Sequence, residues 1–364
     1  MVKRACCAVL MILMTVIFSA GVAMAKEPAA PEVSLQEAVD RALELSKSLK
    51  MAELEKDKAS EQRGDAQKEV KYTPTGMVNP EIESAYATLL QSELNYQIKS
   101  KSYSALQEDI QQQVVDKYST VLSAREARGN AQAAYKKAEW DKRMSQLKLQ
   151  VGILSQLDMT GVNTTFEQKQ SALVQAEQDL GKAYVEFNAL TGFWPEDRPQ
   201  LVTDISYEPI NVTSFTAEVN RAIDNNPDVW AALQNVTIER QDLRMALQPY
   251  DIEKIEIEMA ELSADEAEDE LEKQLILLYH DIVSLEGGIK AAEQGISAAE
   301  EALEAAQLKV DIGMGTEGDL LQAEANLKSA ESTLVGLKAS HSAAMAAYFN
   351  LTSRDVLPAE TPQV

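Results

Sequence analysis

Two stretches of the sequence decide the fold: Val151-Gly-Ile-Leu-Ser-Gln-Leu-Asp158 and Ile312-Gly-Met-Gly-Thr-Glu-Gly-Asp319. The glycine in second position, Gly152 or Gly313, suits the left-handed backbone conformation that ends many helices. The Ser or Thr in fifth position stands three residues before an Asp, which is the pattern of a capping box at the start of a helix. Each stretch therefore predicts a tight turn between two helices.

Apolar residues recur every seven positions beside both turns, as they do where helices pack as coiled coils. The three seams are Met159, Phe166, Leu173, Leu180 and Phe187; Leu275, Ile282, Ile289, Ile296, Leu303 and Val310; and Leu320, Leu327, Leu334, His341 and Tyr348. We predict antiparallel hairpins of helices of about 45 to 60 residues, which makes rods of about 70 to 90 Å.

The two turns belong to a repeated unit. Residues 151–192 align without a gap on residues 312–353, at an offset of 161, with eight of 42 positions identical. Residues 34–43 align on residues 214–223 at an offset of 180. We interpret this as an internal duplication. Each half is expected to hold a short helix, a long helix, a connection, a second long helix, a tight turn and a returning helix.

Proline marks the limits of the two halves. None occurs between Pro80 and Pro195, or from Tyr250 to Leu357. Because proline interrupts helix interiors, these spans are where long helices fit. We divide the chain into a signal peptide (1–25), a first helical repeat (33–192), a linker (193–213), a second helical repeat (214–353) and a C-terminal tail (354–364).

Composition excludes some classes of protein. The 364 residues include 58 Asp and Glu against 34 Lys and Arg, a formal charge of −24 that repels phosphate backbones, so we expect no nucleic-acid partner. Only 5% of the residues are aromatic, which argues against a bulky globular core and favours packing of Ala- and Leu-rich helices. The expected fold class is all-α, with little or no β structure.

The N-terminus has the pattern of a signal peptide. Lys3 and Arg4 precede an apolar run, and an Ala-x-Ala cleavage pattern ends at Ala25. We expect the chain to be exported, the alternative being an uncleaved anchor. Cys6 and Cys7 lie inside this segment, so the mature chain would hold no cysteine and a formal charge of −26, since two basic residues are removed from a chain of charge −24.

With these features the sequence resembles the outer-membrane efflux protein family, the TolC-like exit ducts of tripartite efflux pumps and type I secretion systems. The resemblance covers nearly the whole mature chain. Ser34-Leu-Gln-Glu-Ala-Val39 opens the first half, and a weaker copy that includes Asn225-Asn-Pro227 opens the second. The most specific elements are the two turns, which look like the family's Val-Gly-Leu-x4-Asp hairpin tip; we call them the tips.

The resemblance implies an assembly in the outer membrane or elsewhere in the cell envelope or periplasm. It implies a homo-oligomer, a trimer in the family, whose helices form a hollow barrel below a membrane-spanning β-barrel. Its tips would face a periplasmic adaptor that links the duct to an inner-membrane pump. The residues expected to dock the adaptor are Val151, Gly152, Ile153, Asp158, Ile312, Gly313, Met314 and Asp319.

The sequence departs from the family at the hairpin ends opposite the tips. The family needs two membrane-spanning strands per half, and each takes about 9 to 11 alternating residues. Only residues 69–83, with two prolines, and residues 248–259 are available. We expect the strands to be shortened or missing, with no spanning strand in either segment.

No set of residues predicts catalysis, a metal site or a cofactor. His280 and His341 are the only histidines and fall in separate helices, so we expect packed or interfacial side chains. Carboxylates are spread along helices, as in residues 265–270, which is typical of a solvated face. Without a nucleophile beside a base, we expect no enzyme.

Two explanations of the tips stay open. Glycine, a hydroxyl residue and Asp at this spacing are sufficiently explained as signals that end one helix and begin the next. Ile153 and Met314, however, would be poorly buried at the end of a hairpin, and exposed apolar side chains favour docking.

Two functions follow from these alternatives. The chain is either a component of a transport duct that docks an adaptor, or a non-conducting structural coiled coil of the cell envelope derived from such ducts. The lack of spanning strands favours the structural protein. The retention of both tips favours the duct, which we prefer.

Overall fold

The computed structural model describes residues 29–70, 80–205, 207–245, 250–354 and 356. The expected signal peptide therefore lies outside the described residues, as does most of the C-terminal tail. The helices are α2 (Leu35–Leu45), α3 (Lys47–Glu69), α4 (Pro80–Gln150), α5 (Gln156–Thr191), α6 (Phe215–Asn225), α7 (Pro227–Met245), α8 (Tyr250–Asp311) and α9 (Glu317–Leu351), and the strands are β1 (Glu32–Val33) and β2 (Gln200–Leu201).

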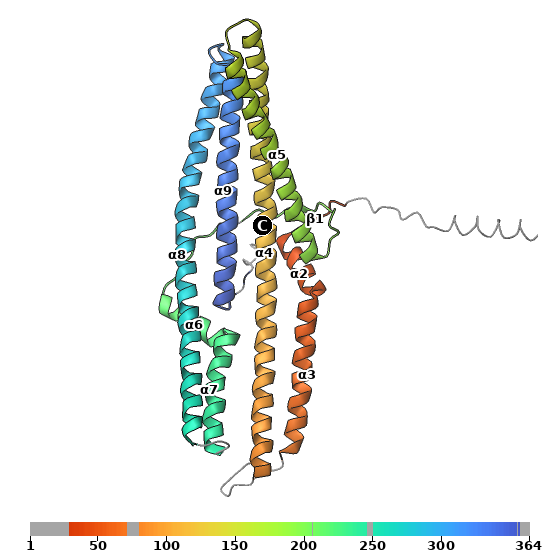
Figure 1. Cartoon of the computed structure of the whole chain (residues 1–364), viewed down its shortest axis with the longest axis vertical. Helices are drawn as coiled ribbons and strands as arrows, with labels where there is room; N and C mark the ends of the chain where they lie inside the picture. Colours follow the sequence, from red (N-terminus) through yellow and green to blue (C-terminus); the bar gives the residue numbers. More distant parts are fainter. Residues whose placement is uncertain (1–28, 71–79, 206, 246–249, 355, 357–364) are drawn as a thin grey trace, which may run out of the picture.

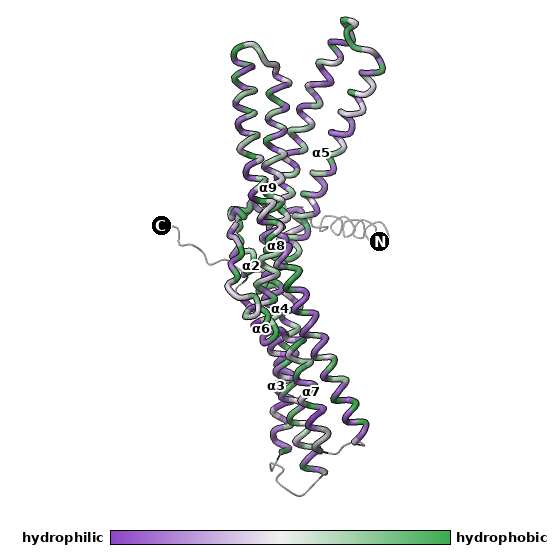
Figure 2. Tube along the Cα trace, turned by 90° about the vertical axis from the view of Figure 1, so that its left-hand side faces the viewer, coloured by the Kyte–Doolittle hydropathy of each residue, from purple (hydrophilic) through white to green (hydrophobic). Residues whose placement is uncertain are grey.

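The helices form one elongated bundle, and the all-α prediction is confirmed (Figure 1). Helices α4 and α8 run most of its length. On α4, α3 packs beside one part and α5 beside the other; α7 and α9 divide α8 in the same way, and α4 also packs against α9. Figure 2 shows polar and apolar residues interleaved along the helices, as expected of rods that bury only one stripe.

Helix α4 is longer than predicted. It has 71 residues instead of 45 to 60, and α8 has 62. At 1.5 Å per residue, α4 is about 105 Å long. No proline lies within it after its first residue, and Gly129 is its only glycine, so nothing in its sequence ends the helix before the tip.

The order of elements repeats as the duplication predicts. The α4–α5 and α8–α9 connections, which hold the two tips, lie at the same end of the bundle (Figure 1). The alignment offset between the two halves is 180 at their start and 161 at the tips, a difference of 19 residues. Helix α7 has 19 residues against 23 in α3, and α8 has 62 against 71 in α4. The remaining 6 positions fall in the connections between these helices.

Equivalent residues of the halves make equivalent contacts. Phe187 and Tyr348, 161 positions apart, are both fully buried. Four residues later, the hydroxyls of Thr191 and Thr352 each donate a 2.8 Å hydrogen bond to the carbonyl of that aromatic residue. The exact domain boundaries stay a prediction, but these contacts support a shared origin of the halves.

The predicted seams form the core. Leu275, Ile282 and Ile289 of α8 are fully buried. Around the middle of the rod, α2, α4 and α5 bury one cluster that includes Phe187, and α6, α8 and α9 bury a second that includes Tyr348. The short helices α2 and α6 therefore pack against the two long hairpins at the level where α4 and α8 change from one packing partner to the next.

The segment expected to be a linker, 193–213, packs against both halves: residues 193–205 lie against the first, and Tyr207, Ile210 and Val212 contact the second. Within it, β2 pairs in parallel with β1, Gln200 opposite Glu32 and Leu201 opposite Val33. The Asp197 carboxylate accepts hydrogen bonds from the amides of Ala29 (2.8 Å) and Trp194 (3.0 Å). These contacts fix the path of the chain between the halves.

The described parts of the two segments opposite the tips are not strands. Residues 250–259 form the first turns of α8, residues 80–83 the start of α4, and Glu69 ends α3. Residues 71–79 and 246–249 lie outside the described residues, so the expectation for them stays a prediction. Within the described part of the chain, none of the helices combines the length and the hydrophobicity needed to cross a bilayer.

The buried seam gives a first testable prediction. Ile282→Ala should lower the free energy of unfolding by about 2 to 5 kcal/mol, because a fully buried isoleucine leaves a cavity. Ile276→Ala on the same helix, where the side chain is 37% exposed, should cost under about 1 kcal/mol. Urea unfolding followed by circular dichroism measures both, and equal losses would contradict the seam.

Candidate functional site

The two tips have the same backbone geometry. Gly152 and Gly313 have φ of 78° and 73°, the left-handed region that their positions required. The amide of Ile153 donates to the carbonyl of Lys148 (2.9 Å), and the amide of Met314 donates in the same way to Lys309 (2.8 Å). Both helices therefore end by the same hydrogen-bonded turn.

Both predicted capping boxes are present. The Ser155 hydroxyl accepts from the amide of Asp158 (3.1 Å), and the Asp158 carboxylate accepts from the amide of Ser155 (3.4 Å). In the second tip, Thr316 and Asp319 make the corresponding bonds at 3.2 and 2.9 Å. The hydrogen bond from the Thr316 amide holds the pKa of the Asp319 carboxyl below its ordinary value. These aspartates start the returning helices.

The apolar tip residues are exposed in the single chain. Val151 and Ile153 are 69% and 77% exposed, and their equivalents Ile312 and Met314 are 59% and 80% exposed. Exposure of neighbouring apolar side chains to water is unfavourable, and clusters of exposed apolar side chains are typical of docking sites. The structure therefore places all eight predicted tip residues together in two equivalent groups; their role in docking stays a prediction.

Sequence reasoning missed part of each tip. Leu147 and Leu308, one turn before the tips, are 55% and 61% exposed and are also 161 positions apart. Lys148 and Lys309 follow them and are exposed as well. Extending the alignment four residues towards the N-terminus would have found both pairs. We call Leu147, Val151 and Ile153 the first tip patch, and Leu308, Ile312 and Met314 the second.

The two tips differ in how they pack against the neighbouring helices. In the second tip, Gly318 is buried beneath the Trp140 ring of α4, and the indole nitrogen of Trp140 donates to Glu317 (3.3 Å). A side chain at Gly318 would collide with that ring. The equivalent residue of the first tip is Leu157, which is 81% exposed. The second tip is thus held against α4, whereas the first offers one more apolar side chain.

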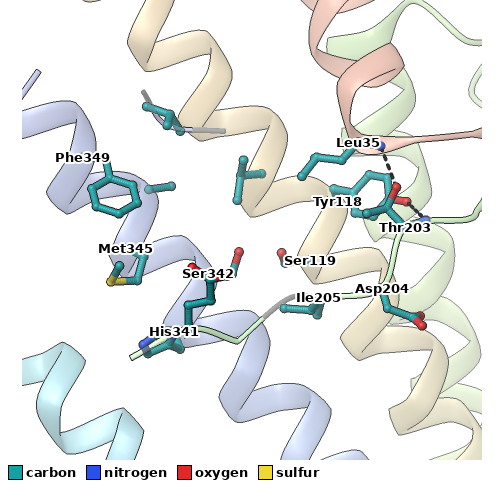
Figure 3. Close-up of a pocket in the computed structure, with 14 residues that line it drawn as sticks. Leu35, Tyr118, Ser119, Thr203, Asp204, Ile205, His341, Ser342, Met345 and Phe349 are labelled. Atoms are coloured by element: carbon teal, nitrogen blue, oxygen red, sulfur yellow. Dashed lines mark hydrogen bonds between the residues drawn. The ribbon is translucent and has the colours of Figure 1, made fainter. Parts of the chain in front are cut away.

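A cavity of about 130 Å³ lies at the middle of the bundle, between the two halves (Figure 3). Its lining is mostly apolar and comes from the start of α2, from α4, from α9, from Val356 and from Thr203, Asp204, Ile205 and Glu208. Tyr118 organises one wall: its hydroxyl accepts from the amide of Thr203 (2.9 Å) and lies 3.4 Å from the carbonyl of Val33. Burial raises the pKa of Tyr118, so it keeps its proton.

His341 lines this cavity and is a packed histidine, as expected. It is 2% exposed, and its Nε2 lies 3.6 Å from a carboxylate oxygen of Glu286 on α8. The Tyr207 ring meets the imidazole edge-on at 5.1 Å between centroids. Burial lowers the pKa of His341, and Glu286 opposes that shift in part. His280, by contrast, is exposed on α8.

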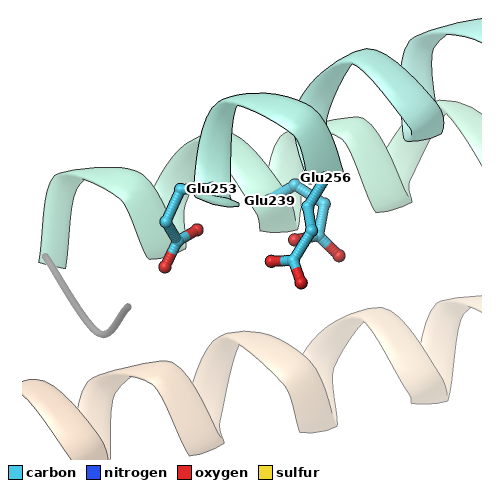
Figure 4. Close-up of side chains that lie close together, drawn as sticks. All are labelled: Glu239, Glu253 and Glu256. Atoms are coloured by element: carbon cyan, nitrogen blue, oxygen red, sulfur yellow. The ribbon is translucent and has the colours of Figure 1, made fainter. Parts of the chain in front are cut away.

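Three glutamates that the sequence did not single out come together near the end opposite the tips (Figure 4). Glu239 of α7 and Glu253 and Glu256 of α8 place one carboxylate oxygen each within 4.8 Å of one another. Glu253 is fully buried. The residues 265–270 that were expected to be solvated are mostly exposed.

This arrangement is that of TolC-like outer-membrane channels, and the predicted resemblance is confirmed for the fold. The structure of the Campylobacter jejuni CmeC outer membrane channel matches with a TM-score of 0.61 at 15% identity, over 91% of this chain and 90% of that one. The open-state Neisseria gonorrhoeae MtrE outer membrane channel matches with 0.66 at 15%, over 88% and 89%. The outer membrane protein VceC of Vibrio cholerae matches with 0.62 at 15%, over 89% and 97%.

The similarity is one of structure. No protein-family model and no curated protein matches the sequence. At these identities the likeness establishes the fold alone, over 88 to 91% of this chain and 89 to 97% of the three channel proteins.

The buried histidine gives a pH prediction. Because the pKa of His341 is lower in the folded chain than its ordinary 6.5, the unfolded chain takes up the proton first. The contribution of neutral His341 to the free energy of unfolding is fully present above pH 6.5 and is lost as the pH falls below that value. His341→Leu introduces the residue found at the equivalent position of the first half, Leu180. This variant should lose less stability than wild type as the pH falls, because it has no imidazole to protonate at this position.

The measurement is urea unfolding of both proteins between pH 7.5 and 5. His280→Gln, an exposed change on α8, is the matched control and should keep the wild-type loss. An identical pH dependence in wild type and His341→Leu would show that the folded chain does not favour the neutral imidazole.

Proposed function

We propose that the chain is an exported component of an efflux or secretion duct, and that its two tips dock a periplasmic adaptor of a tripartite export system. In this proposal the chain assembles into a homo-oligomer, a trimer by family resemblance, in the outer membrane or the adjoining cell envelope. The adaptor connects it to an inner-membrane pump. No chemical step is assigned to the chain.

The observation that carries the proposal is the pair of tip patches. Three apolar side chains are exposed at the same three positions of both halves, although the halves share few identical residues. A tip that served only to reverse the chain would need its glycine and its capping box but not these side chains. Their retention in both halves supports a partner that recognises the same feature twice.

The charge at the tips is consistent with a protein partner. Each patch is bordered by one exposed lysine, Lys148 or Lys309, and by the aspartate of the capping box. An apolar centre with a charged rim is the usual arrangement of a protein–protein interface. The apolar side chains would supply most of the binding energy, and the charged rim would orient the partner.

The second candidate is a non-conducting structural coiled coil of the cell envelope. The helical geometry of the described residues 250–259, where the family resemblance led us to look for strands, favours it. The two candidates differ in two measurable respects, because the structural protein needs neither adaptor binding at the tips nor passage of solute. Uptake and release of a fluorescent dye by source cells with and without the chain would separate them.

The tips give the central prediction. Ile153→Lys combined with Met314→Lys should leave helicity and melting temperature nearly unchanged, because both side chains are exposed. The same change should weaken binding of a purified periplasmic adaptor by about tenfold or more per anchor, since a buried apolar contact is replaced by a charge. Calorimetry and circular dichroism measure the two effects.

A matched control separates the tips from general surface charge. Leu262→Lys adds the same charge at a leucine of α8 that is 62% exposed and far from the tips, and should leave adaptor affinity unchanged. If the double tip variant unfolds the chain, or if it binds each adaptor of the source cell as wild type does, the tips are structural and the second candidate is correct.

A further inference from the structure

The cavity at the middle of the bundle is an apolar space that the chain does not fill. It measures about 130 Å³. Protein interiors are densely packed, and an apolar cavity of about 150 Å³ is large enough to bind benzene. A single aromatic ring or a short alkyl group therefore fits. The apolar side chains of its wall include Leu35, Val115, Ile205, Met345, Ala346 and Phe349.

Two hydroxyl groups in the lining have no hydrogen-bond partner within the described part of the chain. They belong to Ser119 of α4, which is 5% exposed, and to Ser342 of α9, which is partly buried. A serine inside a helix commonly bonds back to its own helix, as Ser340 does to the carbonyl of Gly336 (3.0 Å). Figure 3 shows Ser119 on the side of α4 that faces α9. Because a buried hydroxyl without a partner is unfavourable, the two serines point to a ligand with a polar group.

The charge of the lining is negative. Glu208 lines the cavity, is exposed, and forms no ion pair or hydrogen bond within the described chain. Asp204 also belongs to the lining, although its carboxylate points away from the cavity (Figure 3). The described lining includes no lysine or arginine, and burial lowers the pKa of His341, which favours its neutral form. The polar side of the cavity therefore favours a cation over an anion.

We propose that this cavity binds a small protonated amine with an aromatic or alkyl body, of about the size of benzylammonium. The body fills the apolar space. The ammonium group has three donors, which match the Glu208 carboxylate and the hydroxyls of Ser119 and Ser342. A hydrogen bond from a cation to a carboxylate is stronger than one between neutral groups, so Glu208 supplies the preference for the charged ligand.

The chain forms this wall once. Val115 and Ala346, which are 4% and 2% exposed, face the cavity from α4 and α9. Their equivalents at the offset of 161 are Ile276 on α8 and Val185 on α5, which are 37% and 44% exposed. One ligand per chain is therefore expected, and it contacts both halves and the connection between them. The site lies away from the tips and does not rest on the proposed docking function.

The test titrates the purified full chain at pH 7.5 in ~0.15 M salt, which screens diffuse attraction of cations to the acidic surface. Three probes share one ring and differ in charge: benzylamine, toluene and benzoate. Calorimetry should find one benzylamine per chain with a dissociation constant of about 1 mM or tighter, which is within reach of a molecule of this size. Toluene should bind about tenfold more weakly, and benzoate should not bind. Benzylamine should also raise the melting temperature.

Variants of the lining locate the binding. Ala346→Leu places a larger side chain in the cavity and should abolish benzylamine binding. Ser342→Leu fills the same space from a partly buried position and gives the same result if the first variant folds poorly. Glu208→Gln should weaken benzylamine binding about fivefold to tenfold and leave toluene binding unchanged. Glu196→Gln is the matched control, since it removes an exposed carboxylate of the same connection outside the cavity and should bind as wild type does.

Three results would overturn the proposal. Wild-type protein that binds no benzylamine at ~10 mM would leave the cavity to water alone. Toluene binding as tight as that of benzylamine would assign the cavity to neutral ligands. Benzylamine binding that both leucine variants leave intact, or that Glu208→Gln and Glu196→Gln reduce equally, would assign it to the general acidic surface.

Discussion

The structure depends on burial of a narrow apolar stripe along two very long helices. A helix of 71 residues has no core of its own, so α4 must find a partner for its stripe along all of its length. No single partner spans it: α3 covers one part, α5 the other, and α9 adds a further contact. The capped short helices α2 and α6 lie where the partners change, which explains why the bulky buried side chains, Phe187 and Tyr348, gather there.

Much of this arrangement could be predicted from the sequence because its signals are local or periodic. In spans without prolines, a glycine suited to the left-handed conformation, a hydroxyl residue three positions before an Asp, and apolar residues at a spacing of seven each predict one local structure. The length of α4 was underestimated, although the sequence between Pro80 and Gly152 has no proline and only one glycine, Gly129, so nothing in it ends the helix. The alternation of Ile255, Ile257 and Met259 with glutamates has the period of a strand, yet these residues are helical, since a few alternating residues cannot outweigh α8 as a whole.

The rest could not be predicted, because it depends on which helices become neighbours. Trp140 and Gly318 lie 178 positions apart, and only the pairing of α4 with α9 brings the ring over the glycine. The same is true of Glu239 and Glu253, whose helices are joined by a short connection but whose register is set by packing. The exposed Leu147 and Leu308 were within reach of sequence reasoning; they were missed because apolar residues beside a heptad seam are normally assigned to it.

The differences between the halves fall in one direction. Where the first half has buried Ala38, the second has Glu218, which pairs with Arg354 beneath Tyr348, and the burial of that phenol together with Glu218 raises the pKa of Tyr348 to about 12. Leu180 is replaced by His341, and Ala59 by Glu239. Each replacement puts a titratable group into a packed position that an apolar residue fills equally well in the other half, and each costs stability unless a partner compensates. Since the tips are the feature in which the halves agree most closely, the repeated unit is constant at the end of the rod, whereas packed positions along it differ between the halves.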